Sequence, residues 1–549
     1  MVRDTPALAE PRAATAGLPD WPASPASSSR TSWPSDKAAQ WILWALIVPV
    51  AAVLRFHDIA AKSFWLDEGM SAEIARLPWL QFFRVLWNRE INMALYYLLL
   101  RFYMHIGSSE TFVRGLSVLF SVATVPLIYA LGARLFGRAA GLTAAWLLAI
   151  GAYQVRYAQE ARAYALAAFL ATLATWLLVR NLQRPAFARW GAYSAVCALL
   201  VYAQLFGALL VLAHGVSLLW LPRDSPASEK TPLRNVWKDF GRAVRWFVWL
   251  ILPVVAVAVH IGSTPAAWIR LPTAGDLSGF FQAAAGNAGI GPVWLDALLL
   301  LAAALALRSA WRDKAGSASP NLGNWPTVLV FAWLFVPLMV ILSASIVRPL
   351  FLGRYLMFCL PALALGLAAG LARLRPAIAY WALLAVISVL SVQGTVRYYR
   401  QDFDINREDW RSATSYLLDH AQPGDAIFFS TFSRIPYEYY KSQRPPALSA
   451  TTGPMILNWP GGAQLDSRDF IARPVAEMLT DARPAPDRVW LVLFLDHAPS
   501  GQVNPTSIML RAVYEKGRRL IEEREFPQIT IFLFARDQPP GGASSAPRH

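Results

Sequence analysis

Long apolar segments recur along most of this chain and limit the folds open to it. About eleven runs of roughly 17 to 20 mostly apolar residues lie between residues 41 and 396. Hydrophobic residues make up 56% of the 549 residues, and 23 of them are tryptophans. No soluble domain presents so many segments of membrane length. The sequence therefore predicts a polytopic α-helical membrane protein of about 11 spans.

One apolar run differs from the others because it carries charge. Residues 91–106, INMALYYLLLRFYMHI, contain Arg101 and His105. An arginine at the centre of a membrane helix costs roughly 2.5 to 3.5 kcal/mol on insertion scales, so we expect this run to lie in the interface. The expected crossings are then residues 41–56, 112–131, 139–155, 163–179, 188–203, 205–221, 246–262, 291–307, 327–346, 355–372 and 377–396.

The basic residues agree with this choice of crossings. With the N-terminus inside, every strongly basic connector lies on the inner side, as the positive-inside rule requires. Counting residues 91–106 as a crossing would move most of these clusters outside. The net charge of +15 is carried mainly by these connectors, so we expect no nucleic-acid partner. The odd number of crossings predicts a C-terminal region on the outer face of a bacterial cytoplasmic (inner) membrane.

The rest of the chain divides by composition. Residues 1–38 are rich in Ala, Pro and Ser and are expected to be disordered, without a cleavable signal peptide. The membrane domain covers 39–396, with a first outer loop at 57–111. A soluble α/β domain is expected over 397–537, followed by a second disordered tail at 538–549. The expected helices of the α/β domain are 406–420, 435–441 and 506–516, and its expected strands are 426–430, 489–495 and 529–535.

The cysteines indicate neither a disulfide framework nor a metal site. Cys197 and Cys359 are the only two, and both fall inside apolar runs.

Two adjacent carboxylates stand at the start of the first outer loop. The segment Phe64-Trp65-Leu66-Asp67-Glu68-Gly69 holds them at the bilayer surface between aromatic residues. The predicted topology brings charged and aromatic residues of later loops to the same face: Arg114, Arg156, Tyr157, Glu160, Arg162, Trp268, Arg270, Arg348, Arg354 and Tyr355. Each also has an ordinary structural interpretation. Arginines snorkel to lipid headgroups, Glu160 and Arg162 form a local pair, and the aromatic residues form an interfacial belt.

Taken together, these residue types suit a lipid phosphate substrate. The planar guanidinium of arginine binds phosphate oxygens through two hydrogen bonds and stays charged when desolvated. A sugar on a polyprenyl phosphate leaves an anion behind, which needs positive charge and no proton, whereas the attacking hydroxyl needs a base. One carboxylate and several arginines are therefore enough, in contrast to a glycosidase with its two flanking carboxylates.

Four segments, in order, resemble a known family. They are Trp65-Leu66-Asp67-Glu68, LYYLLLRFYMHIGSSETFVRGLS (95–117), YQVRYAQEARAYAL (153–166) and RPLFLGRYLMFCLPAL (348–363). They resemble the membrane glycosyltransferases of the C-type fold, in the bacterial branch related to protein O-mannosyltransferases and the lipid A aminoarabinose transferase. The resemblance extends to REDWRSATSYLLDHAQPGDAIFF after the last apolar run. This chain departs from the family at Asn92-Met93-Ala94 and at Gln159-Glu160-Ala161-Arg162.

The resemblance implies an inverting transfer of a sugar from a polyprenyl phosphate to a glycolipid, polysaccharide or protein acceptor. It implies Asp67 as the catalytic base with Glu68 in support. The donor phosphate is expected at Arg114, Arg162, Arg354 and Tyr355. Further substrate contacts are expected at Trp65, Arg156, Tyr157, Glu160, Arg270 and Arg348. No cofactor and no metal ligand is assigned, and a need for a divalent metal is left open. Two other hypotheses remain at this stage: a lipid-linked-sugar transporter or flippase, and a non-catalytic glycan-binding membrane protein.

Overall fold

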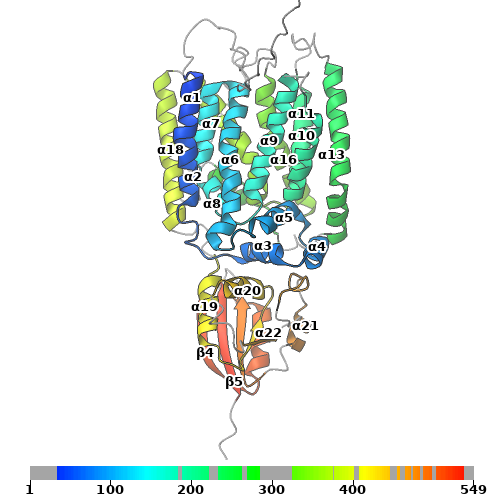
Figure 1. Cartoon of the computed structure of the whole chain (residues 1–549), viewed down its shortest axis with the longest axis vertical. Coiled ribbons are helices and arrows are strands. Elements are labelled where there is room, and N and C mark those ends of the chain that lie inside the picture. Colours follow the sequence, from blue (N-terminus) through cyan, green and yellow to red (C-terminus); the bar gives the residue numbers. More distant parts are fainter. Residues whose placement is uncertain are drawn as a thin grey trace, which may run out of the picture.

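The computed structural model describes residues 34–183, 188–221, 233–262, 269–284, 324–374, 376–400, 407–444, 454–457, 464–471, 474–481, 486–496 and 503–536. The expected crossing at 291–307 and the tail at 538–549 lie outside these residues, and so does the N-terminal tail except for residues 34–38. Helix α1 already begins at Asp36. A bundle of long helices forms one end of the molecule, a small sheet with helices forms the other, and short helices lie between them (Figure 1).

Seven helical segments in the described part of the chain are long and apolar enough to cross a membrane. They are Asp36–Phe56 (α1 Asp36–Ile42, η1 Leu43–Ile47 and α2 Val48–Phe56), α6 (Glu110–Phe136), α9 (Tyr164–Gln183), Asn235–Ile261 in α13 (Leu233–Ile261), α16 (Trp325–Val347), Gly353–Leu371 (η7 Gly353–Cys359 and α17 Leu360–Leu371) and α18 (Ala377–Arg400). The chain is therefore a multi-pass membrane protein.

Three expected crossings coincide with shorter apolar helices. These are α7 (Arg138–Ile150), α10 (Trp190–Ala203) and Leu205–Leu218, which consists of η4 (Leu205–Gly207) and α11 (Ala208–Leu218). A helix of 14 residues spans only about 21 Å at 1.5 Å per residue, less than the apolar core of about 30 Å. Because of these short helices and the undescribed segment, the number eleven stays a prediction.

The expected first outer loop, here called the first loop, forms short helices at one end of the bundle (Figure 1). They are α3 (Leu66–Arg76), α4 (Trp79–Asn88), η2 (Ile91–Met93) and α5 (Ala94–Tyr103). Helix α5 holds most of the charged apolar run and is not among the helices long enough to cross. Arg101 donates to the backbone oxygen of Ala75 at 3.1 Å, and its guanidinium lies 4.0 Å from the ring centroid of Trp79. These contacts satisfy a charge that would be costly in lipid.

The last described residues, 407–536, form a five-stranded sheet with flanking helices, here called the C-terminal unit. The strand order is β2-β1-β3-β5-β4. Strand β1 is parallel to β2 and β3, whereas β5 is antiparallel to β3 and β4. The strands are β1 (Ala426–Phe429), β2 (Met455–Ile456), β3 (Arg488–Phe494), β4 (Arg518–Phe526) and β5 (Ile529–Arg536), and the helices are α19 (Trp410–His420), α20 (Arg434–Ser442), α21 (Val475–Asp481) and α22 (Pro505–Glu515).

The expected strands of this unit coincide with β1, β3 and β5, which are buried. Strand β4 was not expected, and the reason is physical. Its sequence RRLIEEREF lies at the edge of the sheet and exposes most of its residues, so it lacks the apolar character on which strand prediction depends. Strand β2 has only two residues.

The C-terminal unit packs directly on the first loop through α20. The ring of Tyr439 stacks on that of Phe64 with centroids 4.7 Å apart. The hydroxyl of Tyr440 accepts the backbone N–H of Phe64 at 2.7 Å. A Cβ on Gly69 would lie 3.1 Å from the Cβ of Pro436, so glycine permits α3 and α20 to approach closely. The segment that leads into the acidic pair is thus held by the C-terminal unit.

Candidate functional site

Helix α3 places the two adjacent carboxylates in its first turn, where a carboxylate is favoured by the helix dipole. Consecutive helical residues point about 100° apart, so the two side chains meet different surroundings. The side chain of Glu68 is fully buried, whereas that of Asp67 is 26% exposed.

Glu68 is held from several sides. Its Oε1 accepts Nε of Arg114 at 2.8 Å and the backbone N–H of Ala161 at 2.9 Å. Its Oε2 accepts Nη2 of Arg114 at 2.7 Å and Nη2 of Arg407 at 3.1 Å. Four donors therefore surround this carboxylate, and it has no exposed surface from which to act on a substrate.

The hydrogen-bond donors of Arg114 are likewise all used. Its Nη1 donates to the backbone oxygens of Ile59 and Lys62 at 2.6 and 2.8 Å, and its Nη2 donates to that of Ser63 at 3.2 Å. With the two bonds to Glu68, all five guanidinium N–H groups have acceptors, and the side chain is 1% exposed. Arg114 thus bonds to the first loop and to Glu68, which leaves it no N–H group for the donor phosphate expected to bind there.

Asp67 faces a different arginine. Its Oδ2 lies 3.3 Å from Nη2 of Arg162. Nη1 of Arg162 donates to the hydroxyl of Tyr97 at 3.3 Å, and that hydroxyl donates to Oε2 of Glu90 at 3.2 Å. Burial raises the pKa of Glu90, and the charge of Arg162 opposes this shift. Glu90, just before η2, and Tyr97 on α5 thus orient Arg162 toward Asp67; Arg162 itself follows α8 (Ala152–Ala158).

Aromatic residues and a second arginine complete the surroundings of Asp67. The guanidinium of Arg354 lies 5.5 Å from the ring centroid of Trp65, within the range of a cation–π contact. Arg354, Arg162 and Asp67 all interact electrostatically with Tyr164, the first residue of α9. We call Trp65, Asp67, Arg162, Tyr164 and Arg354 the Asp67 cluster.

Several buried polar atoms of this cluster have no hydrogen-bond partner within the described part of the chain. They are Nε1 of Trp65, Nε of Arg162 and the hydroxyl of Tyr164. A buried donor without an acceptor costs about 1–3 kcal/mol. Native proteins leave few such groups, and those that occur call for an explanation. Three of them beside one part-exposed carboxylate indicate a place where ligand oxygen atoms complete the site.

The second cluster of expected contacts lies on α8 and just after it. Arg156 is 3.6 Å from Glu160 and 5.3 Å from the ring centroid of Tyr157. The rings of Tyr157 and Tyr164 are 5.0 Å apart, which joins this group to the Asp67 cluster. Burial raises the pKa of Glu160, and the charges of Arg156 and Arg407 partly offset this. Glu160 thus forms the local pair with Arg156, and Arg162 turns to Asp67.

The remaining expected residues are less closely tied to the cluster. Tyr355 interacts electrostatically with Arg162 and Asp67, and its ring lies 5.6 Å from that of Phe206. Arg270 is 79% exposed and pairs with Asp276 at 3.0 Å. Arg348 is exposed at the end of α16. Among the described residues, no hydrogen bond or ion pair joins Arg270 or Arg348 to Asp67. Trp268 lies outside the described residues.

Two residues of the C-terminal unit belong to the site but were not among its expected members. Arg407 donates to Glu68, as described above, and Oε2 of Glu408 accepts the backbone N–H of Leu66 at 2.6 Å. Glu408 therefore satisfies an open N–H at the first turn of α3, next to Asp67. Burial raises the pKa of Glu408 to about 8, although hydrogen bonds from Trp410 and Leu66 oppose the shift. The only sequence signal was that both charges follow the last apolar run, in a segment that resembles the same family.

The described residues contain no group of three or more His, Cys, Asp or Glu side chains that could hold a metal ion.

Comparison with known proteins gives the fold. Residues 93–235 match the family described as dolichyl-phosphate-mannose-protein mannosyltransferase. Two crystal structures of ArnT from Cupriavidus metallidurans, one in the apo state and one bound to undecaprenyl phosphate, each have a TM-score of 0.56 with this chain at 14% identity, and cover 90% of this chain and 98% of ArnT. A structure of the Archaeoglobus fulgidus oligosaccharyltransferase tethered to an acceptor peptide has a TM-score of 0.48 at 12% identity, covering 92% of this chain and 75% of that one. No curated protein sequence matches the chain. The resemblance to the C-type membrane glycosyltransferases is confirmed.

Proposed function

We propose that this chain, which has the fold of the C-type membrane glycosyltransferases, transfers a sugar from a polyprenyl-phosphate donor to a cell-envelope acceptor. We place the reaction on the outer face of the cytoplasmic membrane, where the first loop and the C-terminal unit would both lie. The observation that carries the proposal is the Asp67 cluster. A part-exposed carboxylate pairs with Arg162, Arg354 lies over the ring of the nearby Trp65, and three buried polar groups lack a hydrogen-bond partner among the described residues.

In the proposed reaction, Asp67 is the general base. The hydroxyl oxygen of the acceptor attacks the anomeric carbon of the donor sugar, and its proton passes to the carboxylate of Asp67. The bond between the anomeric carbon and the phosphate oxygen breaks, and its electron pair leaves with the polyprenyl phosphate. Attack from the face opposite the leaving group inverts the anomeric centre.

The leaving phosphate is assigned to Arg162 and Arg354. Both guanidinium groups stay charged and offer paired N–H donors that suit phosphate oxygens. The buried Nε of Arg162 and Nε1 of Trp65 have no acceptor among the described residues, and phosphate or sugar oxygens would supply one. Positive charge fixed before the reaction stabilises the anion that forms as the bond breaks. Tyr355 and Tyr157 are further candidates for contacts with the donor.

Glu68 and Arg114 receive positioning roles in this proposal. Their buried ion pair, with Arg407, fixes the start of α3 against α6. Because Asp67 directly precedes Glu68 in the first turn of α3, this ion pair fixes the position of the catalytic carboxylate.

The proposal is tested with membranes that contain wild-type protein or Asp67→Asn, supplied with labelled polyprenyl-phosphate sugars and native acceptor. Asp58→Asn is a matched control, because Asp58 lies in the same loop with its side chain 54% exposed, and its φ of 53° suits asparagine. We expect loss of label from the carrier with wild type and Asp58→Asn, and none with Asp67→Asn. Equal loss with all three proteins would exclude Asp67 as the base. No loss with any of them, across several sugars, would favour the transporter hypothesis.

A further inference from the structure

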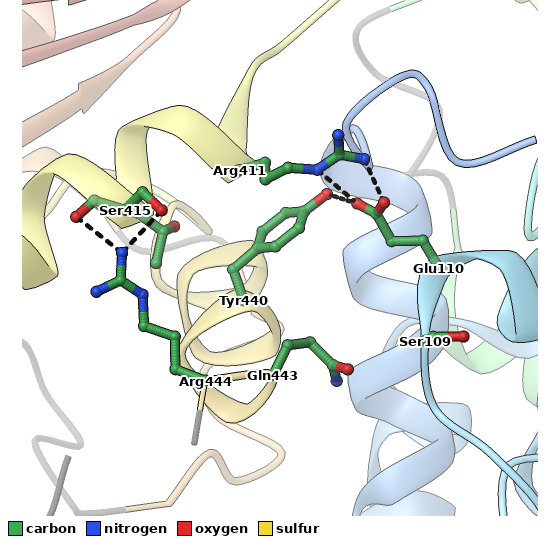
Figure 2. A pocket seen from close by; sticks show the side chains of 8 residues that line it. Ser109, Glu110, Arg411, Ser415, Tyr440, Gln443 and Arg444 are labelled. Atoms are coloured by element: carbon green, nitrogen blue, oxygen red, sulfur yellow. Dashed lines mark hydrogen bonds and ion pairs between the residues drawn. The ribbon is translucent and has the colours of Figure 1, made fainter. Parts of the chain in front are cut away.

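A pocket of about 300 Å³ opens where the C-terminal unit meets the membrane domain. Its walls come from the start of α6, from α19 and from the end of α20 (Figure 2). The volume corresponds to the lower end of small-molecule binding sites. No member of the Asp67 cluster lines it. We call it the junction pocket.

The charges of the junction pocket are already matched to one another. Arg411 pairs with Glu110, which also accepts the hydroxyl of Tyr440 (Figure 2). Arg444 lies 2.6 Å from a carboxylate oxygen of Asp419 and donates to the hydroxyl of Ser415 at 2.8 Å. A phosphate would therefore have to compete with a carboxylate for each guanidinium. The wall instead offers a mixture of N–H donors and hydroxyl and carboxylate acceptors, together with the ring of Tyr440.

One group in the wall lacks a partner. Thr414 on α19 lines the pocket and is 2% exposed, and its hydroxyl has no hydrogen-bond partner among the described residues. A threonine inside a helix usually turns its hydroxyl to a backbone oxygen of the preceding turn, as Thr480 does toward Ala476 at 2.9 Å. An unsatisfied buried hydroxyl destabilises the empty protein. A neutral ligand with its own hydroxyls would satisfy this group as donor or acceptor.

We propose that the junction pocket binds a sugar unit of the acceptor. The mixed donors and acceptors, the balanced charges and the free Thr414 hydroxyl favour a polyhydroxylated, uncharged ligand over a lipid phosphate. That this sugar belongs to the acceptor rests on the proposed function. That the pocket binds a glycan does not depend on it.

The pocket is physically joined to the catalytic loop. Nη2 of Arg411 donates to the backbone oxygen of Ala60 at 2.7 Å. The hydroxyl of Tyr440 bonds to the N–H of Phe64, three residues before Asp67. A sugar bound in the junction pocket would therefore contact residues that hold the segment before Asp67. Binding there would determine which acceptors the protein uses.

The test is retention of the purified full chain, in detergent micelles, on a printed array of glycans. Gln443→Trp places a bulky ring at an exposed position of the pocket wall, and Lys516→Trp is its control at an exposed site on the same unit. Thr414→Val removes the unpartnered hydroxyl at nearly constant volume, with Thr480→Val as its control. We expect wild type and both controls to retain the same glycans. Gln443→Trp should lose most of its retention, and Thr414→Val should lose roughly twofold to tenfold, as expected for one neutral hydrogen bond. Thr414→Val should also keep or raise the melting temperature.

The proposal would be overturned if wild type bound no glycan, or if Thr414→Val and Gln443→Trp retained glycans as well as wild type does. Asp67→Asn separates it from the proposed function, because this variant should lose sugar transfer and keep glycan retention. If wild type transfers no sugar yet retains glycans through Thr414, the junction pocket stands as a glycan site and the proposed function fails.

Discussion

The carboxylate of Glu68 accepts two hydrogen bonds from Arg114, from Nε at 2.8 Å and from Nη2 at 2.7 Å, with both side chains almost fully buried. The carboxylate that directly precedes it in the chain, that of Asp67, is 26% exposed and faces Arg162. Neighbouring acidic residues in one helical turn thus have separate tasks. Glu68 fixes the first loop to α6, whereas Asp67 pairs with Arg162 and keeps part of its surface exposed.

This separation predicts that Glu68→Gln is primarily a folding defect. Breaking one partner of a buried ion pair typically costs about 3–5 kcal/mol, because Arg114 and Arg407 would face an amide in place of a carboxylate. We expect a lower melting temperature and poor recovery of Glu68→Gln in detergent, measured against Glu523→Gln at an exposed site of β4. A variant as stable as wild type that still loses all transfer would instead make Glu68 a chemical participant.

Arg162 and Arg354 are predicted to bind the donor phosphate. A hydrogen bond to a charged group contributes about 1.5–3 kcal/mol, so Arg162→Gln and Arg354→Gln should each weaken binding of undecaprenyl phosphate by roughly tenfold to a hundredfold. The control is Arg270→Gln, because that side chain is 79% exposed and pairs with Asp276. Equal affinity in all four proteins, measured by titration in detergent, would place the phosphate elsewhere.

Glu408 predicts a pH dependence of stability. Burial raises its pKa to about 8 from a usual value near 4.5, so between these values the folded protein holds a proton that the unfolded chain has released. The stabilisation is fully present below about pH 4.5 and is lost as pH rises through about 8, with a total change of roughly a few kcal/mol. As pH rises over this range, the melting temperature of wild type should therefore fall relative to that of Glu408→Gln, whose amide does not titrate. A difference that stays constant with pH would show that Glu408 remains ionised.

The topology can be tested with the same chain. Cys197 and Cys359 are buried, so an exposed cysteine introduced by Lys516→Cys would react with a membrane-impermeant maleimide against a low background. We expect Lys516→Cys to be labelled in intact spheroplasts. Lys37→Cys is the control for the inner side, and it should be labelled only after the cells are permeabilised. The reverse pattern would put the first loop and the C-terminal unit inside.

Sequence patterns predicted the elements whose signal is local. Hydropathy indicated the long helices, Arg101 indicated a first-loop run that does not cross, and buried apolar runs indicated β1, β3 and β5. The partners of the acidic pair could not be predicted this way, because Arg407 is separated from Glu68 by 339 residues. Nor does the sequence say which of two adjacent carboxylates is buried. That depends on which face of α3 meets Arg114 and Ala161, and only tertiary packing decides it.

The most direct test of the catalytic claim is the rate of acceptor-dependent release of polyprenyl phosphate by purified Asp67→Asn at saturating donor. Loss of a general base typically lowers a rate by about 10²–10⁴-fold. We predict a loss of this size with the melting temperature and the binding of undecaprenyl phosphate retained. A rate within a few-fold of wild type, in a variant that binds the carrier normally, would contradict the assignment of Asp67 as the base.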